Sequence, residues 1–261
     1  MPGRIVAAVA AALAFALTHG AHAEALEVTY PAADGVVVFA DFYEADAGPD
    51  APLILLFHQG GSNARGEYAD FIAPRLVEAG FHVLAPDARA GGDVYGGANR
   101  TATAFAGARE DGYCWAYPDL VASLEWAMEQ DCAGPIIAWG SSYSAALALR
   151  LGAEHSPDLA GVLAFSPATG GPMGECSALR FIGEVERPVF LALPQHEFEM
   201  EQKQPLLAAA HDSEIAVHVQ PQGVHGASML HPDRAAGATD AMWREVDAFL
   251  AGCVERAHTP Q

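Results

Sequence analysis

Short apolar runs that alternate with longer segments of helical periodicity constrain the fold of this chain more than any other feature. The runs lie at 52–57, 81–86, 135–139, 161–166, 188–193 and 215–219. They are almost continuously apolar, which is typical of strands covered on both faces, as in a parallel sheet. The segments with helical spacing lie at 65–78, 118–130, 143–154, 200–210 and 238–254. This alternation predicts a single doubly wound α/β domain with helices on both faces of a mostly parallel sheet.

Two further strands are expected before the first of these runs. Segments 26–30 ("LEVTY") and 35–44 ("GVVVFADFYE") flank a turn-rich break, and this pattern predicts an antiparallel pair. Later in the chain, only about twenty residues separate the runs at 161–166 and 188–193. That spacing leaves no room for a large cap domain over the sheet.

The composition narrows the class of partner. The chain has 261 residues, 51% of them hydrophobic, and carries 13 basic and 33 acidic side chains for a formal net charge of −20. Such a charge repels phosphate groups and anionic lipid surfaces, so we expect neither nucleic acid nor a membrane surface as partner. A small-molecule substrate is the remaining expectation, and the composition leaves the oligomeric state open.

The first 23 residues have the features of a secretory signal peptide. Arg4 precedes an apolar run at 5–17, and a small-x-small site follows at 21–23. The apolar run is shorter than the roughly 20 residues that a membrane span needs. We therefore expect an exported protein, periplasmic or secreted, with no stable membrane insertion after signal removal and one mature domain at 24–261.

The segment "IIAWGSSYSAALAL", residues 136–149, places three serines where a predicted strand meets a predicted helix. A nucleophile elbow, G-x-S-x-G, needs small residues two positions before and after the serine, so that strand and helix can approach closely. Only Ser142 meets this condition, with Gly140 before it and the small Ser144 in place of the second glycine. The sequence therefore predicts Ser142 as the nucleophile.

Glycines after the run at 52–57 predict the oxyanion hole. The segment "HQGGSN" follows that run, and glycines let backbone N–H groups approach a developing oxyanion. We expect the amides of Gly60 and of Tyr143, the residue after the nucleophile, to form this pair, with Gly61 as the alternative to Gly60. His58 in the same segment is expected to have a structural role.

The remaining catalytic groups are expected after the last two runs. Glu197 follows the run at 188–193 and is the preferred acid, with Glu199 as the alternative. His225 lies between two glycines in the loop before the last helix, where a general base could reach the nucleophile. His196 has no further ligands at metal-binding spacing, so no metal or other cofactor is expected.

The order Ser142, Glu197, His225 with a glycine-rich loop resembles the α/β-hydrolases. The segments "LLFHQGGSNARGEYADFIAPRL", "WGSSYSAALAL" and "GVHGASML" are similar to a bacterial dienelactone-hydrolase-like branch. The resemblance implies an eight-stranded sheet and hydrolysis of an ester or related acyl bond. Dienelactone hydrolases proper have cysteine at the elbow, so Ser142 argues against that specific activity. Asp87 matches a common position of the family, where we expect it to hold a loop.

The four cysteines of an exported chain favour two disulfides. Cys114 and Cys132 bracket the predicted helix at 118–130, which is about 20 Å long, too long for these two to pair. On the expected fold, Cys114 and Cys176 belong to the edge of the sheet that carries the site, and Cys132 and Cys253 to the opposite edge. We therefore predict the pairs Cys114–Cys176 and Cys132–Cys253.

These features together predict an exported serine hydrolase that cleaves carboxylic esters through a Ser-His-Glu triad and an acyl-enzyme. Gln59 and Trp115 are further candidates for the substrate pocket. One alternative keeps the triad and changes the bond to a thioester, a peptide or a peracid. A second alternative is an inactive hydrolase-fold binding protein, which the complete set of Ser, His and Glu disfavours.

Overall fold

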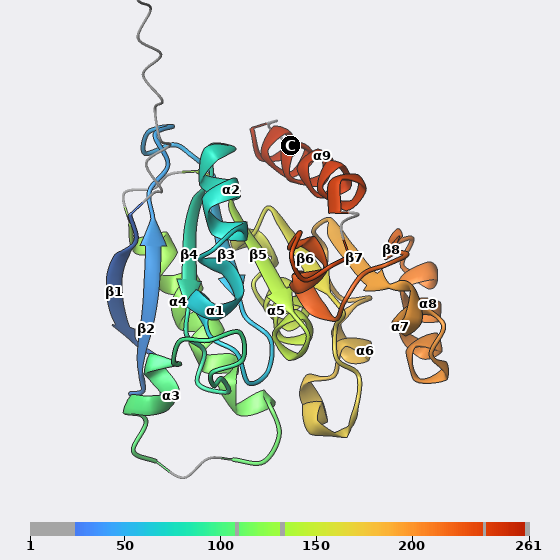
Figure 1. Ribbon diagram of the computed structural model, residues 1–261, viewed down its shortest axis with the longest axis horizontal. Helices are drawn as coiled ribbons and strands as arrows, with labels where there is room; N and C mark the ends of the chain where they lie inside the picture. The colour runs from blue at the N-terminus through green and yellow to red at the C-terminus, as the bar shows by residue number, and fades with distance from the viewer. Residues whose placement is uncertain (1–23, 108–109, 131–133, 237–238, 259–261) are drawn as a thin grey trace, which may run out of the picture.

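One eight-stranded sheet organises the part of the chain that the structure describes, in the order β1-β2-β4-β3-β5-β6-β7-β8 (Figure 1). The structure is a computed structural model that describes residues 24–107, 110–130, 134–236 and 239–258. The predicted signal peptide therefore lies outside the described residues. Two strands at one edge, β1 (Leu26–Pro31) and β2 (Val37–Tyr43), are antiparallel to each other, and β2 is antiparallel to β4.

The other strands run parallel and form the buried centre. They are β4 (His82–Pro86), β3 (Leu53–Phe57), β5 (Ile136–Ser141), β6 (Gly161–Phe165), β7 (Val189–Pro194) and β8 (Val217–Gln220). Every residue of β3, β4, β5 and β6 is buried, because helices cover both faces of the sheet there. The continuous apolar runs thus predicted the parallel strands correctly.

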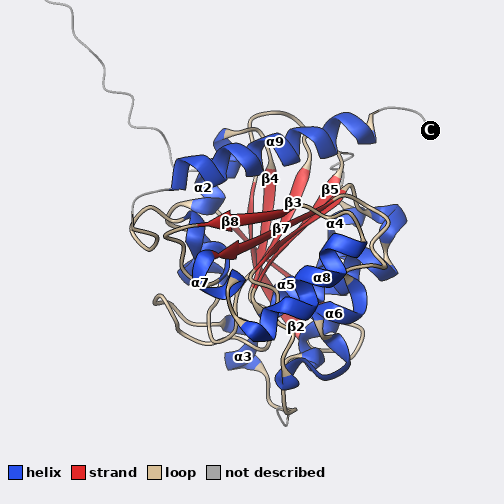
Figure 2. Cartoon of the chain, turned by 90° about the vertical axis from the view of Figure 1, so that its right-hand side faces the viewer, coloured by secondary structure: helices blue, strands red, loops and turns tan. Residues whose placement is uncertain are grey.

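Helices cover the sheet in two layers (Figure 2). On one face, α4 (Tyr117–Glu129), α5 (Tyr143–Glu154), α6 (Ala178–Phe181) and α8 (Gln204–Asp212) bury apolar side chains in one core cluster. On the other face, α1 (Ala64–Tyr68), α2 (Ile72–Glu78) and α9 (Thr239–Ala257) bury theirs in a second cluster. A short helix, α3 (Arg100–Ala104), lies between β4 and α4 along the chain. None of the described helices has the length and apolar character needed to cross a membrane.

The prediction of one helix at 65–78 is wrong in one respect: this segment forms two helices, α1 and α2. The break contains Asp70 and Phe71, which both contact the segment after β8, and Phe71 also contacts the last helix. Asp70 accepts a hydrogen bond from Arg234 Nη2 at 3.1 Å, and the Phe71 ring packs against His231 and Trp243. These long-range contacts favour the break over a continuous helix, and local periodicity does not reveal them.

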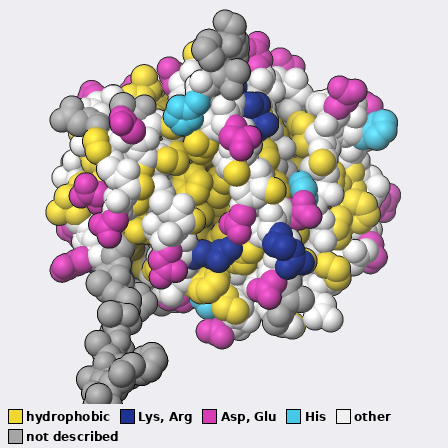
Figure 3. Space-filling view, turned by 90° about the horizontal axis from the view of Figure 1, so that it is seen from above, with side chains coloured by type: hydrophobic (Ala, Val, Ile, Leu, Met, Phe, Trp, Pro, Cys, Tyr) yellow, Lys and Arg dark blue, Asp and Glu magenta, His cyan; other side chains and the backbone are white. Residues whose placement is uncertain are grey.

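Among the charged side chains on the face seen in Figure 3, Asp and Glu clearly outnumber Lys and Arg. This distribution agrees with the net charge of −20. Three arginines, Arg65, Arg89 and Arg100, pair with acidic residues of the β1–β2 hairpin. Arg100 binds Asp41 at 2.7 Å and Asp87 at 2.6 Å, and both carboxylates are buried.

The connection from β6 to β7 is short and carries one end of a disulfide. It holds only the 3-10 helix η3 (Gly171–Cys176) and α6, so the sheet has no large cap. Cys176 is bonded to Cys114, which begins the 3-10 helix η1 (Cys114–Ala116) before α4, with a Cα–Cα distance of 5.4 Å. The predicted Cys114–Cys176 pair is confirmed.

The predicted Cys132–Cys253 pair is wrong for this structure. Cys253 is a free, buried cysteine on α9, and Cys132 lies outside the described residues. The Cys253 sulfur packs against Gly161, where an added Cβ would meet it at 2.5 Å. Close packing of α9 on the start of β6 therefore places this thiol inside the apolar layer.

Removing the Cys114–Cys176 disulfide is expected to lower the free energy of unfolding. The bond closes a loop with a sequence separation of 62, for which chain entropy gives about 4 kcal/mol. We expect this loss in urea unfolding of a Cys114→Ala/Cys176→Ala variant. Dithiothreitol should destabilise the wild type and a Cys253→Ala control, and leave the double variant unchanged. A wild type with equal stability under oxidising and reducing conditions would contradict this expectation.

Candidate functional site

Ser142 lies in a strained turn between β5 and α5. Its φ is 62° and its ψ is −116°, values that a non-glycine residue rarely adopts. The turn is held by the Ser142 N–H, which donates to the Phe165 carbonyl at 2.8 Å. This is the conformation that a nucleophile elbow requires, and it presents the Ser142 side chain at the carboxyl edge of the sheet.

The residues two positions from Ser142 are small for different reasons. A Cβ at Gly140 would lie 2.6 Å from the Ala145 nitrogen, so strand and helix approach too closely for any side chain there. Ser144 is buried, and its hydroxyl lies 2.7 Å from the Phe57 carbonyl and 2.9 Å from the Ser141 carbonyl. Ser144 therefore does more than replace a glycine, because its hydroxyl joins the end of β3 to the end of β5.

Glu197 and His225 meet at the next two strand ends. Glu197 lies in α7 (Gln195–Phe198) directly after β7, and His225 precedes the 3-10 helix η5 (Gly226–Leu230) after β8. His225 Nδ1 lies 2.5 Å from Glu197 Oε1, which leaves the Nε2 side of the ring for a second partner. Glu199 is exposed and accepts a hydrogen bond from Gln195 at 2.5 Å. The structure therefore pairs His225 with Glu197, the preferred acid, and not with Glu199.

A lysine that the sequence analysis did not single out lies behind this acid. Lys203 Nζ is 3.7 Å from Glu197 Oε2 and donates to the Pro167 carbonyl at 2.8 Å. Burial raises the pKa of Glu197, but the hydrogen bond and charge of His225, with the charge of Lys203, outweigh burial and leave this pKa below its usual value. Burial in turn lowers the pKa of Lys203. The site therefore favours an ionised carboxylate behind His225.

The predicted oxyanion donors come from two elements beside Ser142. Tyr143 is the first residue of α5, where helix N–H groups have no partner within the helix. Gly60 follows β3, and the ring of Tyr113 lies across it: a Cβ at Gly60 would lie 2.8 Å from the Tyr113 hydroxyl. Tyr113 also stacks on the buried ring of Tyr143, with centroids 4.6 Å apart. Gly60 thus lets the loop pass close to the Tyr113 ring, and the assignment of the two amides as oxyanion donors stays a prediction.

No protein-family model and no curated protein matches this sequence, whereas solved structures do. An esterase of Pyrococcus furiosus is similar with a TM-score of 0.65 at 17% identity, over 89% of this chain and 90% of that one. Brefeldin A esterase, a bacterial homologue of human hormone-sensitive lipase, has a TM-score of 0.65 at 15% identity, over 94% and 81%. The acylaminoacyl peptidase of Pyrococcus horikoshii has a TM-score of 0.65 at 14% identity, over 87% of this chain and 41% of the peptidase.

The chain has the α/β-hydrolase fold. This result confirms the expected fold and the eight-stranded sheet. The α/β-hydrolase neighbours do not confirm the dienelactone-hydrolase-like branch, which stays a prediction.

His58 and Asp87 have structural roles in this α/β-hydrolase fold, as expected. His58 is buried between the Gln59 carbonyl, 2.9 Å from its Nδ1, and the Asn99 side chain, 3.2 Å from its Nε2, and burial lowers its pKa. Asp87 accepts hydrogen bonds from the Ala64 N–H at 2.8 Å and from Arg100. Both residues hold loops at the carboxyl edge of the sheet.

The two residues predicted for the substrate pocket lie in different surroundings. Gln59 is buried, and its side-chain oxygen would lie 3.1 Å from a Cβ added at Gly226. Trp115 packs against Phe105 with ring centroids 5.5 Å apart, and its indole N–H donates to the Gly112 carbonyl. The first contact places Gln59 against the loop that carries His225, and substrate contact by either residue stays a prediction.

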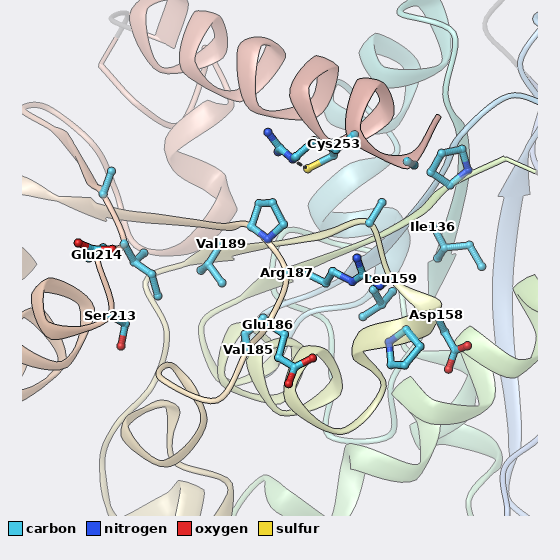
Figure 4. Close-up of a pocket in the computed structure, with 18 of the residues that line it drawn as sticks. Ile136, Asp158, Leu159, Val185, Glu186, Arg187, Val189, Ser213, Glu214 and Cys253 are labelled. Carbon is cyan, nitrogen blue, oxygen red and sulfur yellow. Dashed lines mark hydrogen bonds between the residues drawn. The ribbon is translucent and has the colours of Figure 1, made fainter. Parts of the chain in front are cut away.

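A large cavity of the α/β-hydrolase domain lies at the edge opposite to Ser142. It has a volume of about 1330 Å³, and Ile136, Val189 and Cys253 are among the residues that line it (Figure 4). Ile136 and Val189 begin β5 and β7, whereas Ser142 and Glu197 follow the ends of those strands. This cavity is therefore remote from the candidate site. Within the described ranges, no group of three or more His, Cys, Asp or Glu residues is arranged to hold a metal ion.

Proposed function

We propose that this protein is a serine hydrolase that cleaves carboxylic esters through an acyl-enzyme. The observation that supports the proposal is the Glu197–His225 hydrogen bond of 2.5 Å, together with a serine, Ser142, that has the strained φ of a nucleophile elbow. The names of two similar structures, an esterase and brefeldin A esterase, support ester hydrolysis over other acyl transfers.

The proposed reaction has two halves. Ser142 Oγ attacks the ester carbonyl carbon while His225 Nε2 accepts the hydroxyl proton, and the Gly60 and Tyr143 amides stabilise the oxyanion. The tetrahedral intermediate collapses, the C–O bond to the alcohol breaks, and the imidazolium returns its proton to the leaving alcohol. Water then attacks the acyl-enzyme with the same proton transfers and releases the carboxylic acid and Ser142. Glu197 orients His225 and stabilises its charged form in both halves.

The proposed substrates are small esters or accessible acyl groups of larger molecules. The short β6–β7 connection supports this choice, because it puts no cap over the site. The reaction as proposed uses only side chains and amides of the protein itself. We further propose that the protein is exported, which rests on the signal-like residues 1–23.

A substrate panel tests the proposed reaction. Purified protein is assayed against p-nitrophenyl esters of increasing acyl length, an acyl-coenzyme A thioester and an N-acylated peptide p-nitroanilide. We expect the highest kcat/KM for the short esters. Preferential cleavage of the peptide would instead favour the activity named for the acylaminoacyl peptidase neighbour. Failure to cleave any of them, together with no labelling by a fluorophosphonate, would favour a binding protein and contradict the proposal.

A further inference from the structure

The proposed reaction does not use Glu67, a fully buried carboxylate on α1 with both oxygens engaged. Glu67 Oε2 accepts a hydrogen bond from the Gln59 N–H at 2.6 Å. Glu67 Oε1 accepts one from the Ser141 hydroxyl at 2.7 Å, and the Ser141 oxygen accepts one from the Ala227 N–H at 2.9 Å. One side chain thus connects backbone segments that are far apart in the sequence.

Each of these partners is a near neighbour of a residue of the proposed machinery. Gln59 directly precedes Gly60, Ser141 directly precedes Ser142, and Ala227 follows His225 by two positions. Glu67 therefore binds the loop at 58–63, the oxyanion loop, directly. Through Ser141 it also binds the nucleophile elbow and the segment at 221–227 that carries His225, the histidine loop. We infer that Glu67 is a positioning residue that holds the oxyanion loop and the histidine loop against the nucleophile elbow.

The packing of Gly226 supports this inference. Its φ is +71°, and a Cβ there would collide with Ser141 Oγ and lie 3.1 Å from the Gln59 side-chain oxygen. The histidine loop therefore lies directly against both partners of Glu67. The Gly226 N–H also donates to Ser166 Oγ at 3.0 Å, which fixes the other side of the loop.

The charges around Glu67 agree with such a role. Burial raises its pKa to about 7, and the bonds from Ser141 and Gln59 and the charges of Arg234 and His225 act in the opposite direction. Arg234 also donates to the Glu67 and Gly66 carbonyls, at 3.1 and 2.9 Å, which fixes the end of α1. Above pH 7 the ionised carboxylate accepts both donors, whereas a glutamine has one oxygen for them.

The test compares Glu67→Gln with Glu78→Gln, the same substitution at an exposed position of α2. The catalytic part of the inference rests on the proposed function, so the first readout is kcat and KM on the best ester of the panel. We expect Glu67→Gln to lower kcat by about 100-fold, the effect of a displacement of about 1 Å, with KM changed less than about twofold. Glu78→Gln should match the wild type.

The second readout does not depend on any activity. Amide hydrogen exchange by NMR should be about tenfold faster at Gln59 and at Ala227 in Glu67→Gln, and unchanged in Glu78→Gln. Should Glu67→Gln fail to fold, Ser141→Ala is the second variant, because it removes the hydroxyl that links Glu67 to the Ala227 N–H while the Gln59 N–H keeps its bond to Glu67. We expect a lower kcat and faster exchange at Ala227 but not at Gln59, and a wild-type kcat in this variant would overturn the inference.

The outcomes separate this inference from the proposed function. An inert wild type would contradict the proposed function and leave the decision about Glu67 to the exchange data. A Glu67→Gln variant with wild-type kcat, or with unchanged exchange at both amides, would overturn the inference.

Discussion

A Ser142→Ala variant is expected to lose ester hydrolysis and fluorophosphonate labelling. The substitution removes the only hydroxyl that lies at the tip of the strained turn, and α5 keeps its backbone interactions through the Ser142 N–H and carbonyl. Loss of a serine nucleophile typically lowers kcat by about 10⁶-fold. The measurements are initial rates on a short p-nitrophenyl ester and the mass increase after incubation with the fluorophosphonate.

The control for this variant is Ser213→Ala at the end of α8, far along the chain from the elbow. It should keep wild-type rates and labelling. Both neighbouring serines already use their hydroxyls in the structure, Ser141 toward Glu67 and Ser144 toward the Phe57 carbonyl. Labelling that survives in Ser142→Ala would show that another residue is the nucleophile.

Replacing Glu197 by glutamine is expected to lower kcat by about 10⁴-fold, as the loss of the triad carboxylate does in serine proteases. Glu197 Oε1 accepts a hydrogen bond from His225 Nδ1 at 2.5 Å, and an amide nitrogen in that place favours the wrong tautomer of the ring. The loss should appear in kcat and kcat/KM alike, because the carboxylate stabilises charge on His225 in the transition state.

Glu199→Gln is the matched control, since the two glutamates lie two positions apart and only Glu197 contacts His225. Glu199 is exposed and binds Gln195, so its loss should change kcat less than about twofold. A larger loss in Glu199→Gln than in Glu197→Gln would contradict the assignment of the acid.

Much of the candidate site could be predicted because each part depends on a local rule. Gly140 and Ser144 identify Ser142 through a steric requirement that acts within five residues. The position of His225 follows from the predicted order of strands, since parallel strands bring their carboxyl ends to one edge of the sheet. The antiparallel pair at the start of the chain could be predicted from its turn residues in the same way.

Other features could not be predicted because they depend on contacts between distant segments. The sequence favoured Glu197 over Glu199 but left both open, and only the direction of α7 decides that Glu197 reaches His225. The break between α1 and α2 depends on the contact of Phe71 with Trp243 and on the hydrogen bond of Asp70 with Arg234.

By itself, the sequence determined the α/β class, the elbow serine and the order of the proposed catalytic groups. These follow from hydrophobic periodicity and from small residues at fixed spacing, which act over one strand or one turn. Only the tertiary structure decided that Glu67 lies under the elbow and that Cys253 is free beside Gly161. The reason is physical: burial, pairing and hydrogen-bond partners are set by which elements pack together, and a helix pattern does not specify what its buried face will contact.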